Sequence, residues 1–218
     1  MKSYILLFLS IILTQSCSDL VEDLNNDPNN QTQSAYQTIL TGAEVGNMLF
    51  QTGENARRAC IFAGQYTGID RQHLGFSQYS VTTSDFDALW NDGYVDALRN
   101  AIITEEAANN ENIGPVTIGI TQVLQAQSFG TLTALYGDIP FDEAVNEGFP
   151  NPMFNNQVDV YSKIQTLLDK AISNLQQGSG KPAIGSDIYF DGNPQAWIES
   201  AYTLKARFYM HIKDYPKA

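Results

Sequence analysis

Residues 115–144 read PVTIGITQVLQAQSFGTLTALYGDIPFDEA, a long apolar stretch that stops abruptly at Gly137. Pro115 suits the first position of a helix, where the missing N–H of proline is not needed. Apolar residues then recur at helical spacing. Glycine is the residue type that most often follows a helix in a left-handed conformation, and Pro140 prevents the helix from resuming. The stretch therefore predicts a helix that ends at Tyr136, followed by a turn.

Four acids lie in and after this turn: Asp138, Asp142, Glu143 and Glu147. Two carboxylates ~5–10 Å apart could cleave a glycosidic bond, but adjacent acids in a loop usually point apart. We expect these acids to face solvent in a crossover to the next helix. Asp138 should accept a hydrogen bond from the backbone that follows it, and Phe141 should pack back onto the helix.

Three other segments show helical periodicity. The first begins with a cap at Ser84 or Asp85 and ends at the polar run 109–112. The second spans 159–177. The third begins at residues 193–194, an asparagine cap followed by a proline in the first helical position.

With the helix of 115–136, these segments form two helix-turn-helix pairs, about 84–136 and 158–213. Neither pair could bury its apolar stripe alone, whereas stacked pairs could. The predicted fold class is mostly α, built from tetratricopeptide-like helix-turn-helix pairs with irregular loop insertions.

Two further helical patterns precede these pairs. One runs from Tyr36 to about Phe50, and the other from about Asn55 to Tyr66. Residues 67–83 have little periodicity and several Gly, Ser and Thr, so we expect a long loop or a short irregular strand pair there.

The first 17 residues, MKSYILLFLSIILTQSC, differ from the rest of the chain. Their apolar run is too short to span a bilayer but suits a secretory signal peptide. A cysteine directly behind it resembles a bacterial lipobox, which would make Cys17 the lipidated N-terminus. A secreted protein that is cleaved nearby is the alternative. Residues 18–34 predict a flexible tether, and we assign 35–218 to the helical domain.

The charge balance excludes some partners. Asp and Glu outnumber Lys and Arg by 24 to 12, for a net charge of -12. Such a surface repels phosphate backbones, which argues against nucleic-acid binding, and it offers no polybasic contact to an anionic membrane. Neutral ligands such as sugars and peptides remain, and so do cations.

Motifs of catalysis and of cofactor binding are missing. The sequence contains no phosphate-binding loop, no dinucleotide fingerprint and no nucleophile elbow. Its two histidines, His73 and His211, are far apart and have no metal-ligand spacing. The asparagine-rich tether lacks the glycine and the closing glutamate of a calcium loop. We therefore expect neither an enzyme, nor a metal, nor a cofactor.

One irregular segment is rich in aromatic and amide side chains, which suit the apolar faces and hydroxyl rims of sugars. Its candidate ligand-binding residues are Gln65, Tyr66, Arg71, His73, Phe76, Gln78 and Tyr79. The alternative is that Tyr66 and Phe76 are core residues beneath a long loop.

Four motifs in fixed order resemble the SusD/RagB family. They are WNDGYVDALRNA (90–101), LYGDIPFDEA (135–144), VYSKIQTLLDKAISNL (160–175) and WIESAYTLKARFYMH (197–211). The family residues that we expect to be structural are Trp90, Tyr136, Gly137, Asp138, Pro140 and Trp197. The chain stops soon after its last helix, so it resembles an N-terminal fragment of such a protein, with the C-terminal remainder missing.

The resemblance implies an α superhelix of four tetratricopeptide-like pairs with a more irregular C-terminal half. It also implies a surface-exposed, lipid-anchored outer-membrane lipoprotein that captures a glycan or peptide without cleaving it. Its partner would be a SusC-like TonB-dependent barrel transporter. In the family, part of the ligand edge precedes the helix of Trp90, which agrees with a site in 65–79. The alternative is a tetratricopeptide-type envelope scaffold with protein partners only, although the irregular segment 67–83 argues against a plain solenoid.

Overall fold

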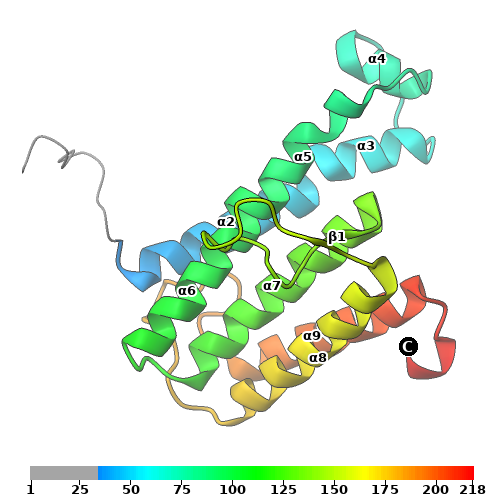
Figure 1. Ribbon diagram of the computed structural model, residues 1–218. Coiled ribbons are helices and arrows are strands. Elements are labelled where there is room, and N and C mark those ends of the chain that lie inside the picture. The colour runs from blue at the N-terminus through cyan, green and yellow to red at the C-terminus, as the bar shows by residue number, and fades with distance from the viewer. Residues whose placement is uncertain (1–33) are drawn as a thin grey trace, which may run out of the picture. The chain divides into compact units, whose positions relative to one another are not determined.

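The computed structural model describes residues 34–218, which are largely helical (Figure 1). The predicted leader with Cys17 and nearly all of the predicted tether lie outside the described residues. The helices are α2 (Tyr36–Thr52), α3 (Glu54–Phe62), α4 (Arg71–Ser77), the 3₁₀ turn η2 (Thr83–Phe86), α5 (Asp87–Asn91), the π-helical segment η3 (Asp92–Leu98), α6 (Arg99–Asn110), α7 (Pro115–Tyr136), α8 (Gln157–Gln176), α9 (Pro194–His211) and the 3₁₀ turn η4 (Tyr215–Lys217). The predicted mostly α class is confirmed.

The helix α7 lies at the centre of the described chain (Figure 1). Of its 22 residues, 16 are buried. It packs against α6 and η3, and also against α8 and α9. A helix that is buried on all sides is typical of the core of a larger helical protein.

Two glycines allow the neighbours of α7 to approach closely. A Cβ on Gly130 would lie 2.0 Å from the ring of Phe208 in α9. A Cβ on Gly119 would lie 2.7 Å from Leu175 in α8. Since real side chains cannot approach so closely, only glycine at these positions permits the observed packing.

The turn after α7 follows the prediction in outline. The helix ends at Tyr136, and Phe141 packs back, with its ring centroid 4.2 Å from that of Phe129. Gly137 has a φ of 80° and a ψ of -118°. The φ is positive as expected, but the ψ is not that of the left-handed helical conformation. The Thr133 hydroxyl donates to the Gly137 carbonyl at 2.7 Å, and this bond closes the turn.

The prediction for Asp138 was wrong. Its Oδ1 accepts a hydrogen bond from the backbone N–H of Gln157 at 2.8 Å, so it caps α8 instead of the backbone that follows it. The Gln157 side chain in turn donates to the Thr133 carbonyl at 2.7 Å. These bonds join the end of α7 to the start of α8. We call the connection between the two helices, residues 137–156, the crossover. It contains two short antiparallel strands, β1 (Ile139–Pro140) and β2 (Phe154–Asn155).

Three predicted boundaries were wrong. The second helix ends at Phe62 rather than at Tyr66, and Gly64 follows with a φ of 70°. Residues 67–83, predicted as a long loop or a short irregular strand pair, contain the helix α4 with loop on either side, because the Asp70 side chain accepts from the Arg71 N–H at 2.8 Å and caps a new helix.

The expected cap at Ser84 or Asp85 also lies elsewhere. Thr82 precedes the helical turn, and its N–H donates to the Asp85 carboxylate at 2.7 Å. The predicted helix that follows is not uniform, since residues 92–98 are π-helical. Apolar spacings of three and four do not distinguish such a segment from an α-helix.

The segment before α9, residues 181–193, returns to α2, and we call it the strap. The Thr41 hydroxyl in α2 donates to the Ser186 carbonyl at 2.8 Å. The Tyr189 hydroxyl donates to the Glu44 carbonyl at 2.8 Å. The strap thereby links the first described helix to the last long one.

We predict that Gly137→Ala destabilises the protein by about 1–3 kcal/mol, because an L-residue is strained at this positive φ. A Cβ at Gly137 would meet no atom within 4 Å, so the cost is one of backbone conformation alone. Urea unfolding measures it.

Gly42→Ala in α2 is the matched control, since that position is equally open but has an ordinary helical φ. It should stabilise the protein by roughly 0.5–1 kcal/mol. Equal stabilities of the two variants would contradict the strain at Gly137.

Candidate functional site

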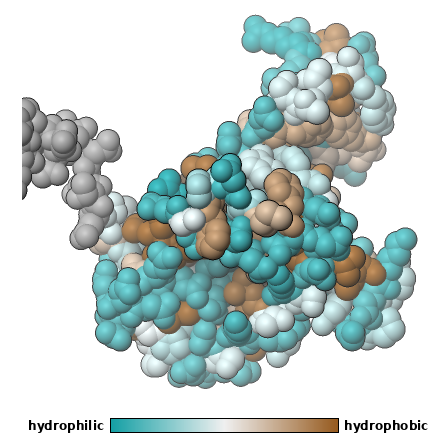
Figure 2. Space-filling view, viewed as in Figure 1, coloured by the Kyte–Doolittle hydropathy of each residue, from teal (hydrophilic) through white to brown (hydrophobic). Residues whose placement is uncertain are grey.

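The helices α3 and α4, with the chain that leads to η2, project away from α7, α8 and α9 (Figure 1). We call residues 54–83 the arm. Its surface carries hydrophobic patches beside hydrophilic ones (Figure 2). The exposed apolar side chains of the arm are Tyr66, Ile69, Leu74, Tyr79 and Val81.

All seven candidate ligand-binding residues lie on the arm. Gln65, Tyr66, Arg71, Gln78 and Tyr79 are exposed, and His73 is half-buried. Phe76 is only 2% exposed, and its ring centroid is 6.0 Å from that of Phe62. It therefore belongs to the core of the arm, as the alternative interpretation held. That alternative fails for Tyr66, which is 60% exposed.

Tyr79 is held in place from one side. Its ring stacks on Phe62, with centroids 5.8 Å apart and an interplanar angle of 25°. Its hydroxyl donates to the Phe62 carbonyl at 3.1 Å. The side chain remains 70% exposed. One face of the ring is thus fixed against the arm while the residue stays accessible, which suits a stacking platform.

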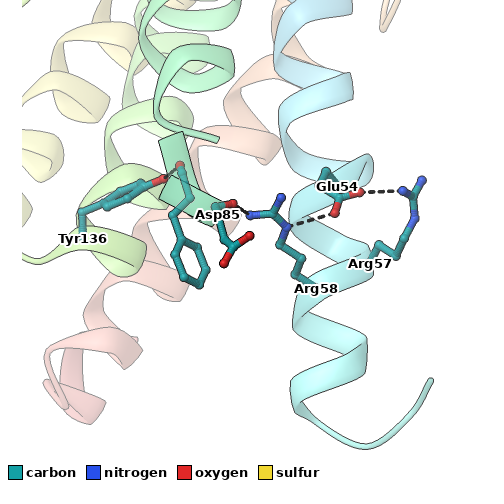
Figure 3. Close-up of polar contacts among 6 residues, drawn as sticks. Glu54, Arg57, Arg58, Asp85 and Tyr136 are labelled. Atoms are coloured by element: carbon teal, nitrogen blue, oxygen red, sulfur yellow. Dashed lines mark hydrogen bonds and ion pairs between the residues drawn. The ribbon is translucent and has the colours of Figure 1, made fainter. Parts of the chain in front are cut away.

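A buried cation, Arg58, joins the parts of the arm. Its Nε donates to Glu54 at 2.9 Å, and its Nη1 donates to the Asp85 carbonyl (Figure 3). The guanidinium also lies 4.8 Å from the ring centroid of Phe76 and 5.6 Å from that of Phe86. An ion pair and two aromatic faces offset the cost of burying the charge.

The turn η2, which follows the arm in the chain, is hydrogen-bonded to α7. The Tyr136 hydroxyl donates to the Phe86 carbonyl at 2.7 Å (Figure 3). Bonds from the Thr82 backbone and hydroxyl hold the pKa of Asp85 below its usual value, so its carboxylate stays charged at the cap. The arm is therefore anchored through η2 to the end of the central helix.

The structure also contains a groove that the sequence analysis did not predict. A groove of about 830 Å³ lies between η3, α6 and the crossover, and its lining includes Trp90, Val95, Arg99, Ile102, Glu106 and Phe149. The lining mixes apolar and aromatic side chains with the charged Arg99, Glu106 and Glu147, and such a combination occurs in ligand sites. The signal in the sequence was the run FPNP (149–152), which places an aromatic and two prolines in the crossover.

Trp90 and Trp197 both lie in aromatic clusters. The ring centroid of Trp90 is 4.7 Å from that of Tyr94 and 5.0 Å from that of Tyr136. Trp197 is 2% exposed, and its centroid is 5.2 Å from that of Phe190.

The acids of the crossover form local bonds. Asp142 accepts from Asn155 at 2.8 Å and pairs with Lys163, while Glu143 accepts from the Met153 N–H at 2.8 Å. Hydrogen bonds from Lys163 lower the pKa of Asp142. Across residues 34–218, no group of three or more His, Cys, Asp or Glu side chains could hold a metal ion. None of the helices in this range is long and apolar enough to cross a membrane.

Several solved structures are similar to this chain. A SusD/RagB family protein from Bacteroides thetaiotaomicron is 26% identical with a TM-score of 0.74, covering 83% of this chain and 39% of that protein. A chitin-binding protein is 22% identical with a TM-score of 0.70, covering 82% and 39%. A chitin-binding SusD homolog from Flavobacterium johnsoniae is 16% identical with a TM-score of 0.60, covering 80% and 39%. The chain thus spans about two fifths of the length of these structures.

The last two similarities establish the fold alone. A search of curated proteins found no match. A SusD-like family model, described as "Starch-binding associating with outer membrane", matches residues 28–218. Since this match covers most of the sequence, the chain belongs to the SusD-like family.

Proposed function

We propose that the chain binds an oligosaccharide through the arm and delivers it to a SusC-like TonB-dependent transporter of the outer membrane. The family description names starch and the outer membrane. Two similar structures are named as chitin-binding. These descriptions, together with the chemistry of the arm, favour a glycan over a peptide.

The observation that carries this proposal is the fixed ring of Tyr79. Its contacts with Phe62 hold the ring before any ligand arrives. A sugar that stacks on it would therefore not need to order the side chain, which lowers the entropic cost of binding. The exposed side chains of Gln65, Arg71 and Gln78 offer hydrogen-bond donors to hydroxyl groups.

The proposed role is binding without cleavage. Of the four acids that were considered for glycosidic cleavage, Asp138, Asp142 and Glu143 are engaged in local hydrogen bonds. We further propose that Cys17 carries the lipid anchor and that the protein is exposed at the cell surface. An acidic chain with a net charge of -12 would then be held by lipid rather than by basic contacts.

The proposal is tested with the full chain in detergent and two ligands, chitohexaose and maltohexaose. Isothermal titration should detect binding of one or both, and the chain should retain a large barrel protein from outer membranes. If the chain retains proteins from outer membranes but binds neither sugar in the titration, the envelope-scaffold alternative replaces this proposal.

Tyr79→Ala should weaken the binding of the bound sugar by about tenfold, which corresponds to about 1.4 kcal/mol. Tyr79→Phe should keep most of the affinity, because the stacking ring remains. Tyr202→Ala is the control, since Tyr202 is also exposed but lies on α9. If the wild type and Tyr79→Ala bind the sugar equally well, the glycan binds elsewhere, and the groove at Trp90 is the next candidate.

Arg58→Met should destabilise the arm by about 2 kcal/mol, because two partly buried acceptors, one of them the Glu54 carboxylate, lose their partner. Hydrogen exchange should become faster in residues 54–83. Arg57→Met is the control, since Arg57 contacts the same Glu54 but its side chain is 51% exposed. It should cost less than about 1 kcal/mol. Similar effects of the two variants would show that burial of Arg58 does not anchor the arm.

A further inference from the structure

Two buried carboxyl groups lie where the strap contacts α2, since Ile188, the residue directly after Asp187, donates its N–H to Glu44. Glu44 is 0% exposed and Asp187 is 2% exposed. Within residues 34–218, neither carboxyl forms an ion pair with a cationic side chain. Two ionised carboxylates buried together without a cation would repel each other at low dielectric, and each would have lost its water. A proton on one of them would remove this repulsion.

The hydrogen bonds identify Asp187 as the ionised partner. Its Oδ1 accepts from the N–H groups of Tyr189 at 2.9 Å and Phe190 at 3.0 Å. Its Oδ2 accepts from the Gly192 N–H at 2.8 Å and from the Trp197 indole at 2.7 Å. A carboxyl that receives four N–H donors is stabilised in its charged form.

Glu44 has the opposite environment. Its Oε2 accepts from the Ile188 N–H at 2.7 Å. Its Oε1 is buried, and no donor reaches it from the part of the chain that the structure describes. A proton on Oε1 would turn this unpaired buried acceptor into an O–H donor, for which the ionised Asp187 carboxylate is the acceptor that we infer.

We propose that Glu44 and Asp187 share one proton at neutral pH, carried by Glu44, and that this proton latches the strap to α2. The latch opens when the proton is lost at alkaline pH. The indole of Trp197 would then lose its fixed acceptor, because the strap carries Asp187.

The pKa shifts of the two carboxyl groups agree with this assignment. Burial and the neighbouring Asp187 carboxylate raise the pKa of Glu44 to about 9. Burial alone would raise the pKa of Asp187, but the bonds from Trp197, Phe190, Gly192 and Glu44 outweigh it and lower the pKa.

The other titratable group that faces the pair is Tyr189. Burial, with Glu44 and Asp187, raises its pKa to about 12, so it stays neutral through the relevant range. The elements α3, η3, α6 and α7 also contact α2. In the described chain they place no cationic side chain in ion-pair contact with Glu44.

The direction of the pH effect follows from the raised pKa. The unfolded chain loses the Glu44 proton near pH 4.5, whereas the folded chain keeps it to about 9. The stabilisation from the proton is therefore fully present below about pH 4.5 and is lost as the pH rises through about 9.

The test is urea unfolding of the full chain from pH 5 to pH 9. The unfolding constant of the wild type should rise with pH, by up to about tenfold per unit from this one group. Glu44→Gln keeps a donor toward Asp187 but cannot ionise, so its unfolding constant should stay nearly constant from pH 5 to pH 8, while that of the wild type rises by up to about 1000-fold. Glu199→Gln, an exposed change on α9, should retain the wild-type slope.

Two spectroscopic readouts keep the test independent of folding yield. In a Trp90→Phe background, Trp197 is the remaining tryptophan, and its fluorescence should change near pH 9 when Glu44 is present but not in the E44Q variant. At pH 7 the infrared spectrum of the wild type should show the C=O stretch of a protonated carboxylic acid that E44Q lacks. Wild-type pH slopes in E44Q, or identical infrared spectra, would overturn the shared proton.

Discussion

The close contact between α7 and its neighbours is the constraint on which the rest of the structure depends. Phe208 of α9 lies against the bare Cα of Gly130, and Leu175 of α8 lies against Gly119. A larger residue at either position would push a neighbouring helix away and open a void in the core. Once α8 and α9 pack against α7, the two ends of α7 have a defined position. The strap, the crossover and the arm are then positioned relative to these ends.

Polar contacts complete that arrangement, because α7 buries amides as well as apolar groups. Gln122 receives a bond from Asn174 of α8 at 3.0 Å and donates to Glu105 of α6 at 2.8 Å. At the start of α7, the carbonyls of Ser179 and Gly180 accept from its first free N–H groups. Buried polar groups that are satisfied in this way specify one relative position of the helices, which apolar packing alone leaves less defined.

The arm is anchored to η2 through the buried Arg58, whereas Tyr79 on the same arm is accessible. Arg58 binds inward to two aromatic faces and a carbonyl, while Tyr79 is held by its hydroxyl and by one ring face. The sequence predicted the location of this aromatic segment but not which rings face inward. Phe76 is buried because α4 turns it toward Phe62 and Arg58, and helix α4 itself depends on a cap by Asp70 that the weak periodicity concealed.

The sequence by itself determined the fold class, several helix ends and the family. Pro115, the pair Asn193–Pro194 and Gly137 mark helix ends through backbone chemistry that acts within a few residues, and the order of four motifs identifies the fold. The tertiary structure alone decided the long-range partners. Asp138 caps a helix that begins 19 residues later, and Glu44 and Asp187 are both buried where the strap contacts α2. Such pairs depend on the path of the chain in space, because a carboxyl group carries no local signal of the donor or acceptor that folding will bring to it.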